Sequence, residues 1–195
     1  MKYVLKSAGN FNHILIDSTG LPNSVHFPLT AISNHNGDIN NEMRLIYVTQ
    51  QETGLPIYFR YIAGNIVDVS TLITAIAELK ECGINTKFAI MDAGYFGENN
   101  IRTLYEHKVS FISRLKHNFK LYKDLTAKYL PSIKKEESLV EYNGRYAYIK
   151  RVQCKLVDDH IGYAYVCLDI ERKGCETQKL FKRAKVQKFD RDEVF

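Results

Sequence analysis

The sequence predicts an α/β fold, in which a mixed β-sheet carries helices on its faces and a β-rich segment follows. Two observations lead to this prediction. Stretches rich in β-branched and aromatic residues come first, and two alternations of amphipathic helix and apolar strand follow them. After residue 119 the pattern changes to alternating, aromatic and basic sequence. A chain of 195 residues is long enough for one sizeable core with an insertion.

Three strand-forming stretches open the chain, at 13–17 (HILID), 43–49 (MRLIYVT) and 57–62 (IYFRYI). Glycine and proline within 18–22 are expected to end the first strand. The sequence ETGLP at 52–56 is typical of a hairpin loop. We therefore expect three adjacent antiparallel strands.

Two strand–helix alternations follow this meander. Asp68 is the expected N-cap of a helix whose apolar positions run over 72–79. An apolar strand at 87–91 comes next, then a helix over 98–107 and a strand over 109–115. Parallel strands joined through helices indicate a sheet with helical layers.

The resulting order, β-β-β-α-β-α-β, is that of the ribonuclease H-like fold, in which the first and fourth strands lie side by side. Asp17 and Asp92 are expected to end these two strands. We divide the chain into an incomplete ribonuclease H-like core at 1–118, a β-rich insertion at 119–173, and a basic tail at 174–195. The tail is expected to lead to core elements beyond the C-terminus.

Asp17 and Asp92 are the candidate catalytic residues. Each follows an apolar run and precedes small residues, so each carboxylate is expected to be held rigidly at a crevice. Two neighbouring carboxylates repel each other, and a divalent cation relieves that repulsion. The residues alone leave a second interpretation open, in which each aspartate only ends a strand and caps a turn.

Four blocks resemble the DDE transposases of bacterial insertion sequences. They are ILIDST at 14–19, GLP at 54–56, GNIVD at 64–68 and AIMDAGYF at 89–96. Further matching positions continue to Lys116. No single block is decisive, but four blocks in the right order at plausible spacing are specific.

This resemblance implies that Asp17 and Asp92 are the first two members of an Asp-Asp-Glu triad that holds two Mg²⁺ (or Mn²⁺) ions in the complete enzyme. The third member is a Glu on a later helix, and no glutamate here stands in the matching signature. The chain is therefore expected to stop before the third carboxylate and to be inactive alone. The implied partners are DNA at transposon ends and at the target, with a homodimer left open.

The two halves of the chain differ in charge. Residues 1–100 carry 6 Lys and Arg against 9 Asp and Glu, a net of −3, whereas residues 101–195 carry 21 against 13, a net of +8. A basic half fits a polyanionic partner or simply a solvated face. The candidate DNA-binding residues are Arg114, Lys116, Arg145, Lys150 and Arg151. In the insertion, the alternation of basic and aromatic residues equally fits an ordinary amphipathic pattern.

The remaining sequence features concern the compartment. No apolar run approaches the roughly 20 residues that a membrane helix needs, and the N-terminal MKYVLKSAGNFNHI lacks the apolar core of a signal peptide. A cytoplasmic location without membrane attachment is expected. The four cysteines form no CxxC pair, so reduced thiols are expected.

Two rival functions stay open. One is a ribonuclease H-like nuclease that cuts DNA but joins no strands. The other is an inactive remnant that at most binds DNA, which the missing Glu makes serious. Joining of a cut DNA end to a second DNA would distinguish the transposase from the nuclease.

Overall fold

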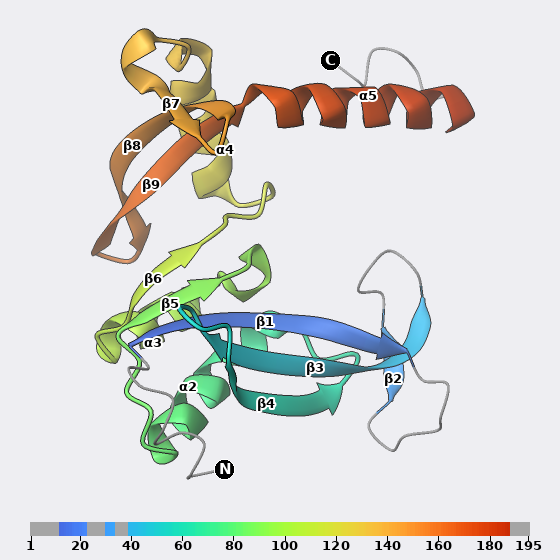
Figure 1. Ribbon diagram of the computed structural model, residues 1–195, viewed down its shortest axis with the longest axis vertical. Helices are drawn as coiled ribbons and strands as arrows, with labels where there is room; N and C mark the ends of the chain where they lie inside the picture. The colour runs from blue at the N-terminus through green and yellow to red at the C-terminus, as the bar shows by residue number, and fades with distance from the viewer. Residues whose placement is uncertain (1–11, 23–29, 34–38, 188–195) are drawn as a thin grey trace. The chain divides into compact units, whose positions relative to one another are not determined.

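The chain forms two compact units, one ending at Lys116 and the other beginning at His117. The computed structural model describes residues 12–22, 30–33 and 39–187, and side chains only to 182 in the last helix (Figure 1).

The first unit is built on a six-stranded mixed sheet. Its main path runs β2-β3-β1-β5-β6, and β4 pairs with β3. The strands are β1 (His13–Pro22), β2 (Ala31–Ser33), β3 (Asn40–Gln50), β4 (Pro56–Ala63), β5 (Phe88–Met91) and β6 (Ser110–Ser113). Strands β1, β3 and β4 are adjacent and antiparallel, whereas β5 runs parallel to β1 and β6. The predicted ribonuclease H-like order is confirmed, and β2 is a short addition to it.

Strand β1 is longer than the sequence predicted. It continues through Gly20 and Pro22, so Asp17 lies inside the strand and not at its end. The reason is the pairing with β3, which extends from Ile14 opposite Gln50 to Pro22 opposite Glu42. A long antiparallel partner overrides the local breaking tendency of these residues. Only the parallel pairing with β5 stops beside Asp17, because β5 ends at Met91.

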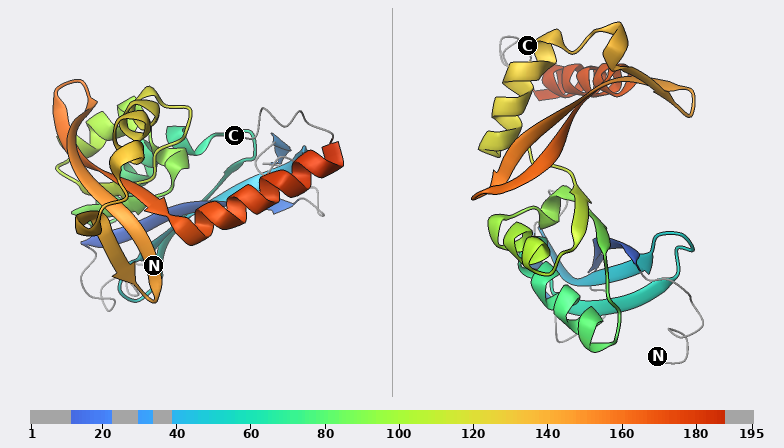
Figure 2. Two further views of the ribbon diagram at one scale, coloured as in Figure 1. Left: turned by 90° about the horizontal axis from the view of Figure 1, so that it is seen from above. Right: turned by 90° about the vertical axis from the view of Figure 1, so that its left-hand side faces the viewer.

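Two helices, α2 (Leu72–Glu81) and α3 (Glu98–Glu106), lie on the same face of the sheet (Figures 1 and 2). Alternate strand residues face them and are buried, among them Ile14 and Ile16 of β1 and Met91 of β5. The predicted capping role of Asp68 is wrong. Asp68 begins a short 3-10 turn, η1 (Asp68–Ser70), and Thr71 is the N-cap of α2.

The second unit is a three-stranded antiparallel sheet that packs on α4 (Lys120–Tyr129). Its strands are β7 (Leu139–Tyr142), β8 (Arg145–Val157) and β9 (His160–Asp169), in that order across the sheet. Asn143 and Gly144 both have positive φ, 52° and 72°, as the predicted two-residue hairpin turn requires. The core joins Val166 of β9 to Leu125 of α4 and to Ile133.

The last described element is helix α5 (Ile170–Gln187), and it includes the start of the segment interpreted as a basic tail. The sequence analysis did not predict this helix, although the sequence carries two signals for it. Asp169 accepts a hydrogen bond from the backbone N–H of Arg172 at 2.9 Å, which is an N-cap interaction. Arg172 and Glu176 form an i, i+4 ion pair at 2.8 Å. Residues 188–195 lie outside the described structure.

Within the described residues, no helix is long and apolar enough to cross a membrane. The four cysteines, Cys82, Cys154, Cys167 and Cys175, are free thiols.

After β4 the chain passes very close to the backbone of β3 at Gly64, and a substitution there tests this packing. A Cβ at position 64 would overlap the backbone carbonyl oxygen of Glu42, so the β3–β4 region must shift to accommodate it. Gly64→Ala is expected to lower the free energy of unfolding by about 1–3 kcal/mol, measured by urea denaturation. In contrast, Gly174→Ala adds a Cβ in open space within α5 and should leave stability unchanged or raise it. An equal effect of both changes would contradict this packing.

Candidate active site

Asp17 and Asp92 occupy neighbouring positions on two hydrogen-bonded strands. The parallel register pairs Ile16 with Met91, and the aspartates are the next residue in each chain. Asp92 keeps extended backbone angles (φ −74°, ψ 167°), so the alternation of side chains continues through it. Neighbouring strands are about 4.8 Å apart. Because Ile16 and Met91 face the helices, both aspartates project from the opposite face.

Two hydrogen bonds hold the carboxylate of Asp17. The Tyr47 hydroxyl donates to Oδ2 at 2.9 Å, and the backbone N–H of Ser18 donates to Oδ1 at 2.8 Å. Tyr47 lies directly opposite Asp17 on β3. The hydrogen bond to Asp17 raises the pKa of Tyr47, and partial burial and the charge of Asp17 raise it further. The phenol therefore remains a donor at neutral pH, and both oxygens keep further acceptor capacity.

Arg114 stands on the other side of the pair. Its Nη1 lies 3.6 Å from Oδ1 of Asp92, and the Ser113 hydroxyl donates to the Asp92 carbonyl oxygen at 3.3 Å. Tyr47 of β3, Asp17 of β1, and Asp92 and Arg114, which directly follow β5 and β6, thus form a row across the sheet. The sequence identified three of these four residues. Tyr47 was missed because only the β1–β3 register places it here.

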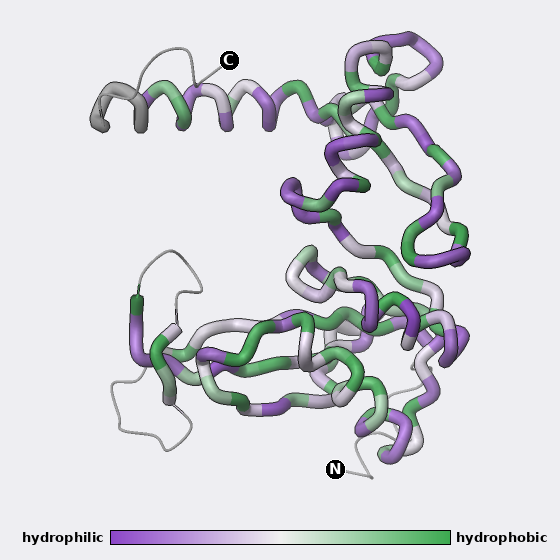
Figure 3. Tube along the Cα trace, turned by 180° about the vertical axis from the view of Figure 1, so that it is seen from behind, coloured by the Kyte–Doolittle hydropathy of each residue, from purple (hydrophilic) through white to green (hydrophobic). Residues whose placement is uncertain are grey.

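The row lies on a largely apolar sheet face that neither α2 nor α3 covers. Phe59, Tyr61 and Ile112 are exposed there although they are large hydrophobic residues. The hydropathy tube shows the hydrophobic stretches along the strands of this sheet (Figure 3).

A second polar cluster lies behind the sheet, on the helix side. Asp68 accepts hydrogen bonds from the Ser18 hydroxyl at 2.7 Å and from Arg44 Nη1 at 2.9 Å. The side chains of Arg44 and Asp68 are only 6% and 15% exposed. Nearby Tyr95 is buried, which raises its pKa, and the charge of Asp68 adds to this effect. The sequence had suggested only turn and cap roles for this segment.

The donor set of the aspartate pair fits a hard divalent cation. Both side chains offer oxygen, the pair is exposed, and Mg²⁺ commonly takes one or two carboxylates together with water and phosphate oxygens. In the described part of the chain, no three His, Cys, Asp or Glu residues gather closely enough to enclose a metal. Asp17 and Asp92 therefore form an open pair rather than a closed structural metal site.

The predicted DNA-binding residues belong to both units, and those of the second unit lie on two faces of its sheet. Arg114 belongs to the aspartate row, and Lys116 is half-buried at the end of the first unit. On β8, Lys150 points toward α4, with its Nζ 5.2 Å from the centre of the Tyr129 ring. Arg145 and Arg151 lie on the opposite side of the sheet, which we term the open face.

The open face of β8 and β9 combines aromatic and basic side chains. Arg151 stacks on Tyr163, with 3.7 Å between the guanidinium carbon and the ring centre, and it pairs across the ladder with Tyr165. Tyr165 is 63% exposed. Arg145 is partly neutralised by Asp169 at 2.8 Å and by Glu171. The tyrosines of β9 were missed because their neighbours on β8 are distant in sequence.

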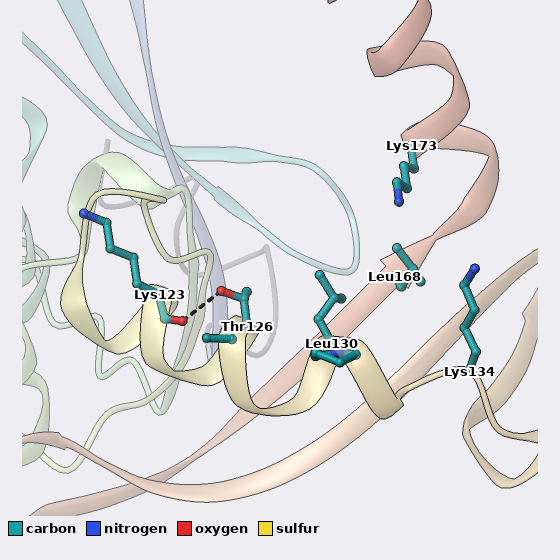
Figure 4. A pocket seen from close by; sticks show the side chains of 8 residues that line it. Lys123, Thr126, Leu130, Lys134, Leu168 and Lys173 are labelled. Carbon is teal, nitrogen blue, oxygen red and sulfur yellow. Dashed lines mark hydrogen bonds between the residues drawn. The ribbon is translucent and has the colours of Figure 1, made fainter. Parts of the chain in front are cut away.

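A shallow basic hollow also lies in the second unit (Figure 4). Three lysines, Lys123, Lys134 and Lys173, line it together with apolar residues such as Leu130 and Leu168. The hollow contains neither aspartate. It adds positive surface to the second unit without forming an enclosed ligand site.

The fold and the paired aspartates define a ribonuclease H-like domain. Residues 9–186 match the family model described as the transposase DDE domain. Because this match covers most of the chain, the protein belongs to that family. A comparison with curated proteins finds no match.

Two similar solved structures come from transposase complexes. One is a piggyBac transposase synaptic complex with hairpin DNA, with 11% identity and a TM-score of 0.45 over 82% of this chain and 33% of that chain. The other is a Drosophila P element transposase strand transfer complex, with 13% identity and a TM-score of 0.30 over 74% and 35%. The protein spans about a third of the length of each.

The two arginine–aspartate pairs should differ greatly in their effect on stability. Arg44→Met leaves the carboxylate of Asp68 buried without a cationic partner and is expected to cost about 3–5 kcal/mol of unfolding free energy. Arg114→Met removes a pair whose side chains are 71% and 56% exposed, and should cost less than about 1 kcal/mol. Urea denaturation measures both. A larger loss of unfolding free energy from Arg114→Met than from Arg44→Met would contradict the burial of the Arg44–Asp68 pair.

Proposed function

We propose that this protein is a catalytic-domain segment of a bacterial insertion-sequence DNA transposase acting in the cytoplasm. In this proposal, Asp17 and Asp92 bind Mg²⁺ or Mn²⁺, and the enzyme cuts DNA at the transposon ends. The freed 3′-hydroxyl then attacks target DNA. The observation that carries the proposal is the β1–β5 register, which places both aspartates side by side on one exposed face.

The residues of the row have distinct roles in this proposal. Bound ions would activate the attacking oxygen and stabilise the leaving oxygen of a phosphodiester. Asp17 and Asp92 would supply carboxylate ligands. Tyr47 holds the orientation of Asp17 through its hydrogen bond. Arg114 lies next to Asp92 and is free to exchange that exposed contact for a phosphate oxygen of the DNA.

The second unit would supply DNA contacts. Its open face offers Arg151 for phosphates and tyrosines for exposed bases. Lys150 lies on the other side of the sheet and is not part of this surface. The net charge of +8 over residues 101–195 favours a polyanion.

The metal site can be tested without DNA. Fe²⁺ with ascorbate and peroxide generates hydroxyl radicals that cut the backbone next to a bound ion. Fragments ending near residues 17 and 92 are expected, and excess Mg²⁺ should suppress them. Asp17→Asn and Asp92→Asn should each abolish the specific cuts, whereas Asp124→Asn, an exposed carboxylate of the second unit, should not. Unchanged cutting in Asp92→Asn would refute the metal site.

The DNA surface can be tested with two adjacent residues that point to opposite faces. Arg151→Ala should weaken binding to a 30-base duplex or single strand and reduce the salt dependence by about one counterion. Lys150→Ala should bind like the parent, because its ammonium lies over Tyr129. Fluorescence anisotropy at several salt concentrations measures both quantities. Equal losses would place the DNA elsewhere on the unit.

A further inference from the structure

Asp68 is a largely buried carboxylate, with a side chain 15% exposed, and the proposed chemistry has no use for it. It ends the GNIVD block, and its sequence role as a helix cap is not what the structure shows. Burying an ionised carboxylate is costly unless it is well paired. The partners of Asp68 therefore indicate what it does.

Asp68 connects to the first aspartate through Ser18. The Ser18 hydroxyl donates to Asp68 Oδ1 at 2.7 Å, and the backbone N–H of the same serine donates to Asp17 Oδ1 at 2.8 Å. The Ser18 side chain is thus bound to Asp68 on the covered side of the sheet, while its backbone N–H orients the Asp17 carboxylate on the exposed side. Arg44 fixes the same Asp68 oxygen from β3.

The segment that follows the second aspartate passes close to Asp68. A Cβ at position 94 would lie 2.8 Å from Asp68 Oδ2, so only glycine permits this approach without movement. Two residues before Gly94 stands Asp92. The buried Asn100 of α3 adds a second link, because its amide donates to the carbonyl oxygens of Val69 and Tyr95, both at 2.8 Å. The turn η1 is therefore joined to η2 (Ala93–Tyr95), which begins directly after Asp92.

The position of Asp68 excludes it as a third ligand in the row. Ser18 alternates with Asp17 along β1 and projects to the helix side. Arg44 is 5% exposed and lies on the same buried side as Ile46 and Val48 of β3. The backbone of the sheet thus separates the Asp68 carboxylate from the exposed face of Asp17 and Asp92.

We infer that Asp68 is a positioning residue. It fixes the segment after Asp17 and the segment after Asp92 relative to each other, on the covered face of the sheet behind the metal site. This inference rests on the proposed function. Carboxylates on separate strands keep a constant separation only if the backbone beside each of them is fixed, and groups that orient metal ligands influence affinity strongly. The Arg44–Asp68–Ser18 cluster fixes β1 next to Asp17, and the Asn100 bonds hold η1, which Asp68 begins, against the turn after Asp92.

The test measures Mn²⁺ binding by electron paramagnetic resonance of the free ion, using the 195-residue chain. Replacing the buried pair together, Arg44→Leu with Asp68→Leu, removes the cluster without leaving an unpaired charge, so the double variant should fold. Its Mn²⁺ affinity is expected to fall about 10-fold. Ser18→Ala, which leaves the Arg44–Asp68 pair intact, should weaken binding in the same direction by a smaller factor.

Two controls separate the possible outcomes. Ser70→Ala removes the 2.8 Å hydrogen bond from the Ser70 hydroxyl to the Val67 carbonyl oxygen but leaves the bonds of Ser18 and Asn100 in place, so it should bind Mn²⁺ like the parent. Asp17→Asn should abolish binding. Thermal unfolding of each variant identifies any loss of affinity that merely follows a loss of folding.

Three results would overturn the inference. If the double variant and Ser18→Ala bind like Ser70→Ala while Asp17→Asn does not bind, Asp68 is only structural and the proposed metal site stands. If the double variant, though folded, loses binding as completely as Asp17→Asn, Asp68 is itself a ligand. If Asp17→Asn binds like the parent, the proposed metal site fails together with the inference.

Discussion

The parallel pairing of β1 with β5 is the constraint on which the candidate site depends. It joins two segments that are 75 positions apart and sets Ile16 opposite Met91. A shift of one residue in this register would turn one aspartate into the helix-covered core. Burial of Ile14, Ile16, Ala89 and Met91 against the helices opposes such a shift. The apolar residues that precede the aspartates therefore determine where the carboxylates point.

The same sheet separates two kinds of carboxylate. Asp17 and Asp92 lie on an exposed face, where water, ions and phosphate have access. Asp68 lies on the covered face and is satisfied by a serine and an arginine. Their environments differ although all three are aspartates within one unit. Access to solvent suits the first two to ligand binding, and the bonds from Ser18 and Arg44 suit the third to holding the backbone.

In the second unit, the two faces of the sheet divide the basic residues between them. Its sheet has one face packed on α4 through Val166 and Leu125, and the alternation along β8 sends neighbouring basic residues to opposite sides. Lys150 and Arg151 are adjacent in sequence and yet meet different surroundings, a tyrosine of α4 and a tyrosine of β9. A count of basic residues therefore overstates the positive charge that either face of this sheet presents.

The sequence by itself determined the order of the long strands and helices of the first unit and the Asn143–Gly144 turn. It also singled out Asp17 and Asp92 as the candidate pair. Periodicity and turn residues act locally, so they are readable along the chain. Only the tertiary structure decided that β1 continues past Asp17, that Tyr47 bonds Asp17, and that Asp68 pairs with Arg44. Helix α5 also escaped prediction, although its N-cap Asp169 was visible. Each of the first three depends on tertiary contacts between residues at least 20 positions apart, which leave no local periodic signal.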